Sequence, residues 1–251
     1  MIKEIIKNLE ELSDKSRSFD SDYKYSDEIV VPRVTRILQS MLNEEYIAQW
    51  ANSLGFKRLG YKKTLQDAAN NGTYTHNSIE YFLRNNKDID LDTIPYISRD
   101  IVFNTYGSFK KWWNIINQSN TIEIIYVEHK LIYKYFAGTL DLLLKINGDY
   151  WLVDFKTSNH IGFKYHLQVA AYRYMLKELY DIDISGAIIL QLNKNLISFK
   201  EHVLDFNKDI VLDHINKCEL LFLSLVQSYY LRYDVEIEFQ AISNIEKRKR
   251  V

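Results

Sequence analysis

The dipeptide Asn147-Gly148 stands between two apolar runs in the middle of the chain, and it restricts the fold more than any other short feature. An Asn-Gly pair in this setting is the strongest local signal for a β-hairpin with a two-residue turn. We therefore expect antiparallel strands directly before and after it. With these two residues in the turn, the register places Asp141 opposite Asp154.

This register gives the two faces of the hairpin different chemistry. Directly opposed side chains have Cβ atoms about 4.5–5.5 Å apart, and two carboxylates at that distance repel each other unless a cation compensates them. Lys156 points to the same face as Asp154, because side chains alternate along a strand. The other face is expected to be wholly apolar and to carry Leu140, Leu142, Leu144, Trp151, Val153 and Phe155. One face would then be core, and the other would hold a divalent-metal site with a catalytic lysine.

Composition narrows the class of protein. The chain has 251 residues, is 47% hydrophobic and carries a net charge of -1, so net charge gives no argument for nucleic-acid binding. Cys218 is the only cysteine, which excludes an intramolecular disulfide and a cysteine-ligated zinc or iron–sulfur cluster. No apolar run reaches the roughly 18 residues of a membrane span. We expect a cytoplasmic protein with no membrane segment.

Hydrophobic periodicity predicts the order of the elements. Helices are expected over residues 1–13, 44–55, 73–85, 98–118, 164–180 and 207–231, and residues 30–38 start extended and then enter a helix. Strands are expected over residues 121–128, 130–136, 184–192 and 196–203, in addition to the hairpin. This order predicts an α/β fold in which helices flank a mixed central sheet. Residues 1–120 would form a mainly helical N-terminal extension and residues 121–251 the α/β core, within one compact domain.

Further polar residues that could belong to a functional site precede and follow the hairpin in the sequence. His76 and Glu80 lie four residues apart and so share one helical face. Glu128 ends a predicted strand before the hairpin. Gln168 and Tyr172 share a face of the helix that follows it. Each also has a structural explanation, such as packing, a solvated helix face or a charge at a strand edge, and the sequence leaves both readings open.

Taken together, the series resembles the PD-(D/E)XK nuclease superfamily and, within it, the RecB-like branch. That branch combines a helical histidine with Gly-x-x-Asp, Asp/Glu-x-Lys and Gln-x-x-x-Tyr. The matching positions are His76, Gly138 to Asp141, Asp154 to Lys156, and Gln168 to Tyr172. Residues 32–38 and 72–76 also resemble phage-type exonucleases and the mitochondrial genome maintenance exonuclease. The chain is similar to the members that have no iron–sulfur cluster.

The resemblance implies a restriction-endonuclease-like core with a Mg²⁺ or Mn²⁺ centre. Carboxylate oxygens are the hard ligands that both ions prefer, and an imidazole suits Mn²⁺ better than Mg²⁺. The implied metal ligands are Asp141, Asp154, the Phe155 backbone carbonyl and His76, with Glu128 and Glu80 as further candidates.

Other residues would act on the substrate. Lys156 would orient or deprotonate the attacking water, or stabilise charge on the phosphate. Gln168 and Tyr172 would support the site or hold the nucleic-acid backbone, and Arg33 and Arg36 are candidates for phosphate contacts.

The resemblance therefore implies a metal-dependent DNA nuclease. We expect an exonuclease on single-stranded DNA or duplex ends, in DNA recombination, repair or replication, and a phage origin would fit. Two alternatives stay open: a structure- or sequence-selective endonuclease on the same fold, and a catalytically weak nucleic-acid-binding module. The hairpin geometry by itself indicates only the metal site.

Overall fold

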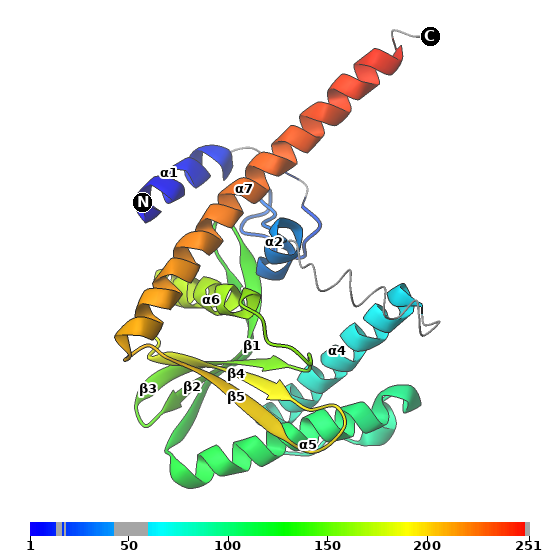
Figure 1. The fold of residues 1–251 in the computed structure, drawn as a ribbon, viewed down its shortest axis with the longest axis vertical. Helices are drawn as coiled ribbons and strands as arrows, with labels where there is room; N and C mark the ends of the chain where they lie inside the picture. Colours follow the sequence, from blue (N-terminus) through cyan, green and yellow to red (C-terminus); the bar gives the residue numbers. More distant parts are fainter. Residues whose placement is uncertain (14–16, 18, 43–59, 249–251) are drawn as a thin grey trace.

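The computed structural model describes residues 1–13, 17, 19–42 and 60–248, so the helix expected over residues 44–55 lies outside the described residues. The elements are α1 (Ile2–Ser13), α2 (Val34–Met41), α4 (Tyr61–Asn85), the 3-10 helix η1 (Leu91–Thr93), α5 (Tyr96–Ser119), β1 (Ile122–Ile132), β2 (Ala137–Ile146), β3 (Asp149–Lys156), α6 (Lys164–Tyr180), β4 (Gly186–Leu192), β5 (Phe199–Asp205) and α7 (Asp209–Arg248). Figure 1 shows α6 and α7 on one side of the sheet, and α4 and α5 on the other.

The sheet is mixed, as the sequence predicts. Its strand order is β1-β2-β3-β4-β5. β3 and β4 pair in parallel, whereas β1–β2, β2–β3 and β4–β5 are antiparallel. Parallel neighbours need a crossover connection, and α6 supplies it. The α/β fold with a helix-flanked mixed sheet and a helical N-terminal region is therefore confirmed.

The central hairpin has the predicted turn and, up to Leu142 opposite Val153, the predicted register, but the expected pair of Asp141 and Asp154 lies beyond the end of the ladder and is not formed. Asn147 and Gly148 adopt φ angles of 52° and 100°, the left-handed backbone that a type I′ turn requires at both positions. Pairing between β2 and β3 runs from this turn, without a shift, to Leu142 opposite Val153.

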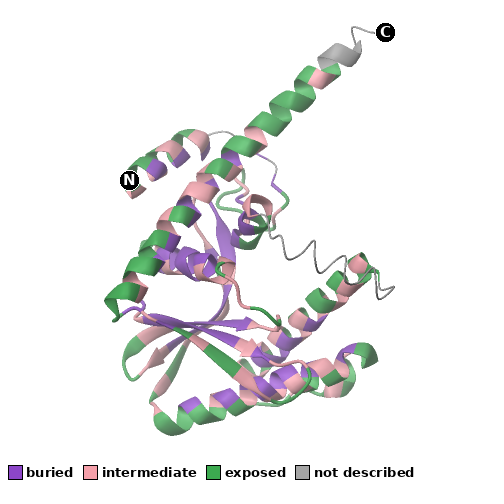
Figure 2. Cartoon of the chain, viewed as in Figure 1, coloured by how far each residue is buried: buried purple, intermediate pink, exposed green. Residues whose placement is uncertain are grey.

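Helices cover both faces of the sheet. The prediction of one apolar face and one polar site face therefore fails in part, because the face expected to hold the site also carries an apolar layer. Leu142 and Val153 pack in an apolar layer against α4 and α5, as expected. Leu143 and Leu152, on the opposite face, belong to a second layer that includes residues of α6 and α7. Leu140 also packs in this second layer, contrary to expectation. Leu140 lies beyond the last β2–β3 pair, so pairing with β3 does not determine which face its side chain points to. Figure 2 shows the buried residues along the strands and on the helix faces turned toward them.

Two helix boundaries differ from the prediction. α4 begins at Tyr61 and not near residue 73, although Asn71 and Gly72 are weak helix formers. The later turns of α4 pack on the sheet through Ile79, and the weak propensity of Asn71 and Gly72 does not set where the helix begins. α7 continues to Arg248 and not to residue 231. Within the described part of the chain, no helix is long and apolar enough to cross a membrane.

The strand predictions differ at β1 and β5. β1 is continuous where two strands were expected, because it pairs with β2 on both sides of Glu128, the residue at which the first strand was predicted to end. The β1–β2 register also shifts between Ile124 and Tyr126. β5 spans Phe199–Asp205, a few residues later than expected.

Replacing Gly148 with alanine tests the hairpin turn. A Cβ at this position meets no atom within 4 Å, so the cost is backbone strain alone. We expect Gly148→Ala to lower the free energy of unfolding by about 1–2 kcal/mol in urea denaturation.

The matched control is Gly72→Ala in the interior of α4. An added Cβ there would make an ordinary 3.8 Å contact with the Thr157 hydroxyl. This change should leave the free energy of unfolding unchanged or raise it by up to about 1 kcal/mol. Equal losses in both variants would contradict the turn assignment.

Candidate metal-binding active site

Asp141 occupies the point where the ladder between β2 and β3 ends. The last pair is Leu142 and Val153. Beyond it, the Phe155 backbone N–H donates a hydrogen bond to Asp141 Oδ2 at 2.6 Å. Asp141 is only 7% exposed, and a buried carboxylate is costly without such a partner. Burial raises the pKa of Asp141 above its ordinary value.

Lys156 neutralises Asp154 on the same face of β3. Its Nζ lies 2.7 Å from Oδ1 and 2.6 Å from Oδ2 of Asp154. Only Oδ1 accepts a hydrogen bond in suitable geometry, so Oδ2 is a buried acceptor without one. Burial raises the pKa of Asp154 and the nearby Lys156 lowers it, and together they leave the pKa of Asp154 raised to about 6. Burial lowers the pKa of Lys156, but Asp154 and Asp141 outweigh it, so the amine stays protonated at neutral pH.

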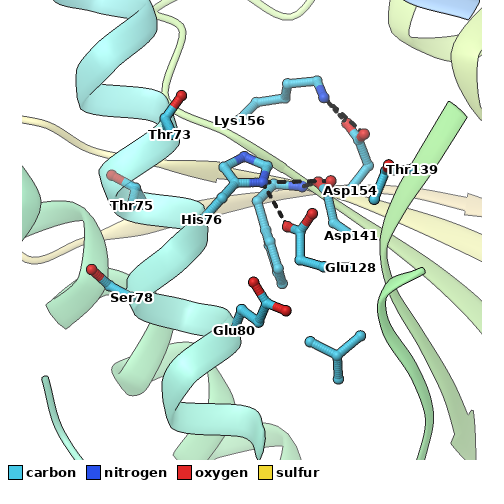
Figure 3. Close-up of polar contacts among 12 residues, drawn as sticks. Thr73, Thr75, His76, Ser78, Glu80, Glu128, Thr139, Asp141, Asp154 and Lys156 are labelled. Carbon is cyan, nitrogen blue, oxygen red and sulfur yellow. Dashed lines mark hydrogen bonds and ion pairs between the residues drawn. The ribbon is translucent and has the colours of Figure 1, made fainter. Parts of the chain in front are cut away.

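His76 of α4 completes the group from the opposite side. Its Nδ1 lies 3.1 Å from Glu128 Oε1 and 3.5 Å from Asp141 Oδ1. Glu128 has a φ of 44°, a backbone conformation that is uncommon for a residue other than glycine. Burial lowers the pKa of His76, but Asp141 and Glu128 outweigh burial and raise it to about 9. Figure 3 shows the three side chains pointing toward one another.

These donors fit a divalent cation. One ligand atom from each of His76, Glu128 and Asp141 lies within 4.8 Å of the other two. Two carboxylates and an imidazole suit Mn²⁺, and the carboxylates suit Mg²⁺. Asp154 lies at the same end of the hairpin, but both of its oxygens are within 2.7 Å of the Lys156 ammonium, so a cation would have to share this carboxylate with the lysine. A cation here would compensate buried negative charge that Lys156 and His76 otherwise balance.

Asp154, Glu80 and Phe155 were implied as metal ligands, but each takes another partner, and Asp154 pairs with Lys156 outside the three-residue group. Glu80 forms an ion pair with Arg84 at 2.8 Å and stands outside the three-residue group. Arg84 also donates to the carbonyl of Val127, which holds this pair against β1. Phe155 gives its amide to Asp141 and packs its ring edge-on against His76. A metal bond to its carbonyl stays a prediction.

Gln168 and Tyr172 are buried on α6, beside β2. Gln168 Nε2 donates to the Tyr172 hydroxyl at 3.3 Å. The ring of Tyr172 covers Gly138 so closely that a Cβ there would lie 2.7 Å from ring atom Cε1. The glycine of Gly-x-x-Asp therefore makes room for the tyrosine of Gln-x-x-x-Tyr. This contact ties α6 to the strand that carries Asp141.

Arg33 and Arg36, the two candidates for phosphate contacts, have surroundings that do not include the metal donors. Arg33 forms an ion pair with Asp22, and its guanidinium lies 5.7 Å from the ring centre of Tyr23. Arg36 lines a separate cavity of about 290 Å³ between α2 and α7. Phosphate contacts by either residue stay a prediction.

One residue near the site was not expected from the sequence. Tyr165 places its ring centre 5.1 Å from the Nζ of Lys156. Its position, three residues before Gln168 on one helix, was the available signal, since residues at that spacing share a face.

Comparison with known families gives one match. A family model described as the PD-(D/E)XK nuclease superfamily matches residues 57–229, which is more than half of the chain. The match includes α4 with His76, the hairpin and α6. No curated protein matches the chain.

Metal binding should stabilise the fold. At a Mn²⁺ concentration 100 times the dissociation constant, we expect the melting temperature to rise by roughly 5–10 °C, since only the folded chain holds these ligands together. Differential scanning fluorimetry with and without EDTA measures the shift. Glu128→Gln and Asp141→Asn should remove most of it.

Glu80→Gln is the matched control, because Glu80 pairs with Arg84 outside the group. It should keep the full shift. A shift lost in Glu80→Gln but kept in Glu128→Gln would place the ion elsewhere.

The contact between Gly138 and Tyr172 is open to a double-mutant cycle. Gly138→Ala should cost about 1–3 kcal/mol of unfolding free energy, because the ring must move. In a Tyr172→Leu background the added methyl group has room. The double variant should then be no less stable than Tyr172→Leu alone, within about 0.5 kcal/mol. Additive losses would show that the two residues do not interact.

Proposed function

Because the chain belongs to the PD-(D/E)XK nuclease superfamily, whose members are metal-dependent phosphodiester hydrolases, we propose that it is a deoxyribonuclease of the RecB-like branch. We further propose that it is an exonuclease on single-stranded DNA or duplex ends. The observation that carries the proposal is the group at the end of the hairpin. It combines clustered metal donors with a partly buried lysine that is ion-paired with a carboxylate.

Asp141, Glu128 and His76 would hold Mg²⁺ or Mn²⁺, with Asp154 as a further ligand. Such an ion polarises the phosphodiester and lowers the pKa of a bound water. The Phe155 amide fixes one oxygen of Asp141, so its other oxygen is oriented before substrate arrives. Preorganised groups of this kind lose little energy to reorganisation during reaction.

Lys156 is the group that would act on the substrate. Asp154 holds its ammonium in a site that leaves the side chain 15% exposed. From there, the ammonium can donate to a non-bridging phosphate oxygen or hold the attacking water. The first role would stabilise the negative charge that develops on the phosphate, and the second would position the nucleophile.

The exonuclease assignment draws support from the segment 32–38, which resembles phage-type exonucleases. The Ala137 N–H at the start of β2 donates to the Pro32 carbonyl at 3.0 Å. Arg33 forms a β-bridge with Ala137. The segment thus lies beside the Gly-x-x-Asp strand. A role in DNA recombination, repair or replication follows from the same resemblance.

Removing the lysine or its carboxylate tests the proposal. Lys156→Ala and Asp154→Asn should each lower Mn²⁺- or Mg²⁺-dependent cleavage of end-labelled DNA at least about 100-fold, as expected for groups that assist proton transfer or charge stabilisation. The control is Lys177→Ala, an exposed lysine of α6 that pairs with Asp181. It should keep wild-type activity. Activity that persists in both site variants would refute this active site.

Covalently closed single-stranded circles distinguish the two modes of cleavage. An exonuclease needs an end and should leave circles intact while it degrades the linear form of the same DNA. Cutting of circles at a comparable rate would favour an endonuclease. Binding of DNA without cleavage of any form would favour the catalytically weak binding module.

A further inference from the structure

A cavity of about 200 Å³ opens directly beside Lys156. Its walls come from α2, α6 and the end of β3, and they include Leu38, Lys156, Tyr165 and Gln168. The metal donors His76 and Glu128 do not line it. The cavity therefore extends the site on the lysine side, away from these two metal donors.

We propose that this cavity receives one unpaired nucleobase of the strand that is being cut. The inference rests on the proposed nuclease function and specifies its substrate as a strand that is single-stranded at the site of cleavage.

The first argument is the aromatic wall. The Nζ of Lys156 and of Lys164 lie 5.1 and 5.4 Å from the ring centre of Tyr165. The Tyr165 hydroxyl donates to Ser158 Oγ at 3.3 Å, which restrains the ring. An aromatic side chain flanked by cations is the combination that single-strand binding sites use, with the base on the ring and the backbone on the charges.

The second argument is the size and lining of the cavity. Sites for whole small molecules measure roughly 300–1,000 Å³, so the smaller cavity suits one ring system and not a complete nucleotide. Leu38, only 5% exposed, supplies apolar surface, while Thr35 and Gln39 supply hydrogen-bonding groups. A nucleobase offers the same combination of flat apolar faces and polar edges.

The third argument is the position of Lys156, which belongs both to the cavity wall and to the reacting centre. A base in the cavity would lie next to the phosphate that meets this ammonium. A base inside a duplex is stacked and paired, and it must be extruded at a cost before it can enter a pocket. We therefore expect the site to accept single-stranded DNA, and duplex DNA only at ends where the base pairs open.

Binding without cleavage provides the test. A short single-stranded oligonucleotide with one 2-aminopurine is titrated with wild-type protein in EDTA, and fluorescence quenching reports stacking. Leu38→Trp fills the cavity, and Tyr165→Leu removes the ring. Each should weaken binding roughly 5–150-fold, the range that corresponds to loss of one stacked base. Tyr165→Phe keeps the ring and should bind within about threefold of wild type.

Ile237→Trp is the control for an added indole. Ile237 is 49% exposed on α7, and it lines none of the cavities described above, so binding should not change. Thermal melting shows which variants fold. If Leu38→Trp does not fold, Tyr165→Leu alone provides the test. Unchanged affinity in a folded Tyr165→Leu or Leu38→Trp variant would overturn the inference.

The two proposals fail in different ways. Binding in EDTA does not depend on catalysis, so absence of metal-dependent cleavage would count against the nuclease alone. Wild-type protein that cleaves single strands equally well with an abasic site at every position near the cut would overturn the base pocket alone.

Discussion

The parting of β2 and β3 beyond Leu142 and Val153 is the constraint on which the site depends. Up to that pair, backbone groups satisfy one another. Beyond it, the Asp141 carboxylate accepts from the Phe155 amide, and the Asp154 carboxylate rests on Lys156. Buried carboxylates are stable only with such partners. The same end of the hairpin therefore gathers negative charge and the cations that balance it.

Elements distant in sequence meet at this point because both faces of the sheet are covered. α4 and α5 pack on one apolar layer and bring His76 to Asp141. α6 packs on the other layer and places Tyr172 over Gly138. Glu128 reaches His76 from β1, at a residue where the strand departs from regular geometry. The site therefore depends on the packing of α4 and α6 on opposite faces of the sheet and on the position of Glu128 in β1.

The features that could be predicted from the sequence are those that depend on neighbouring residues, such as a turn and the strand pairing it imposes. The hairpin register followed from Asn147-Gly148, because this dipeptide selects a turn type and the turn fixes the pairing. The predicted start of α4 was wrong, because the helix packs on the sheet through its later turns and the weak propensity of Asn71 and Gly72 does not set where it begins. The proximity of His76 to Glu128 required tertiary packing that no periodicity reveals. The shared face of Lys156 and Asp154 was predicted from strand alternation, whereas Tyr165 beside that lysine was missed.

The central claim is that this charge cluster is a metal site, and anomalous diffraction from crystals grown with Mn²⁺ tests it most directly. The account predicts a peak about 2.2 Å from a carboxylate oxygen of Asp141, with Glu128, Asp154 or His76 among its other ligands. A crystal with Mn²⁺ in excess that shows no peak near Asp141, with Lys156 still seated on Asp154, would contradict it.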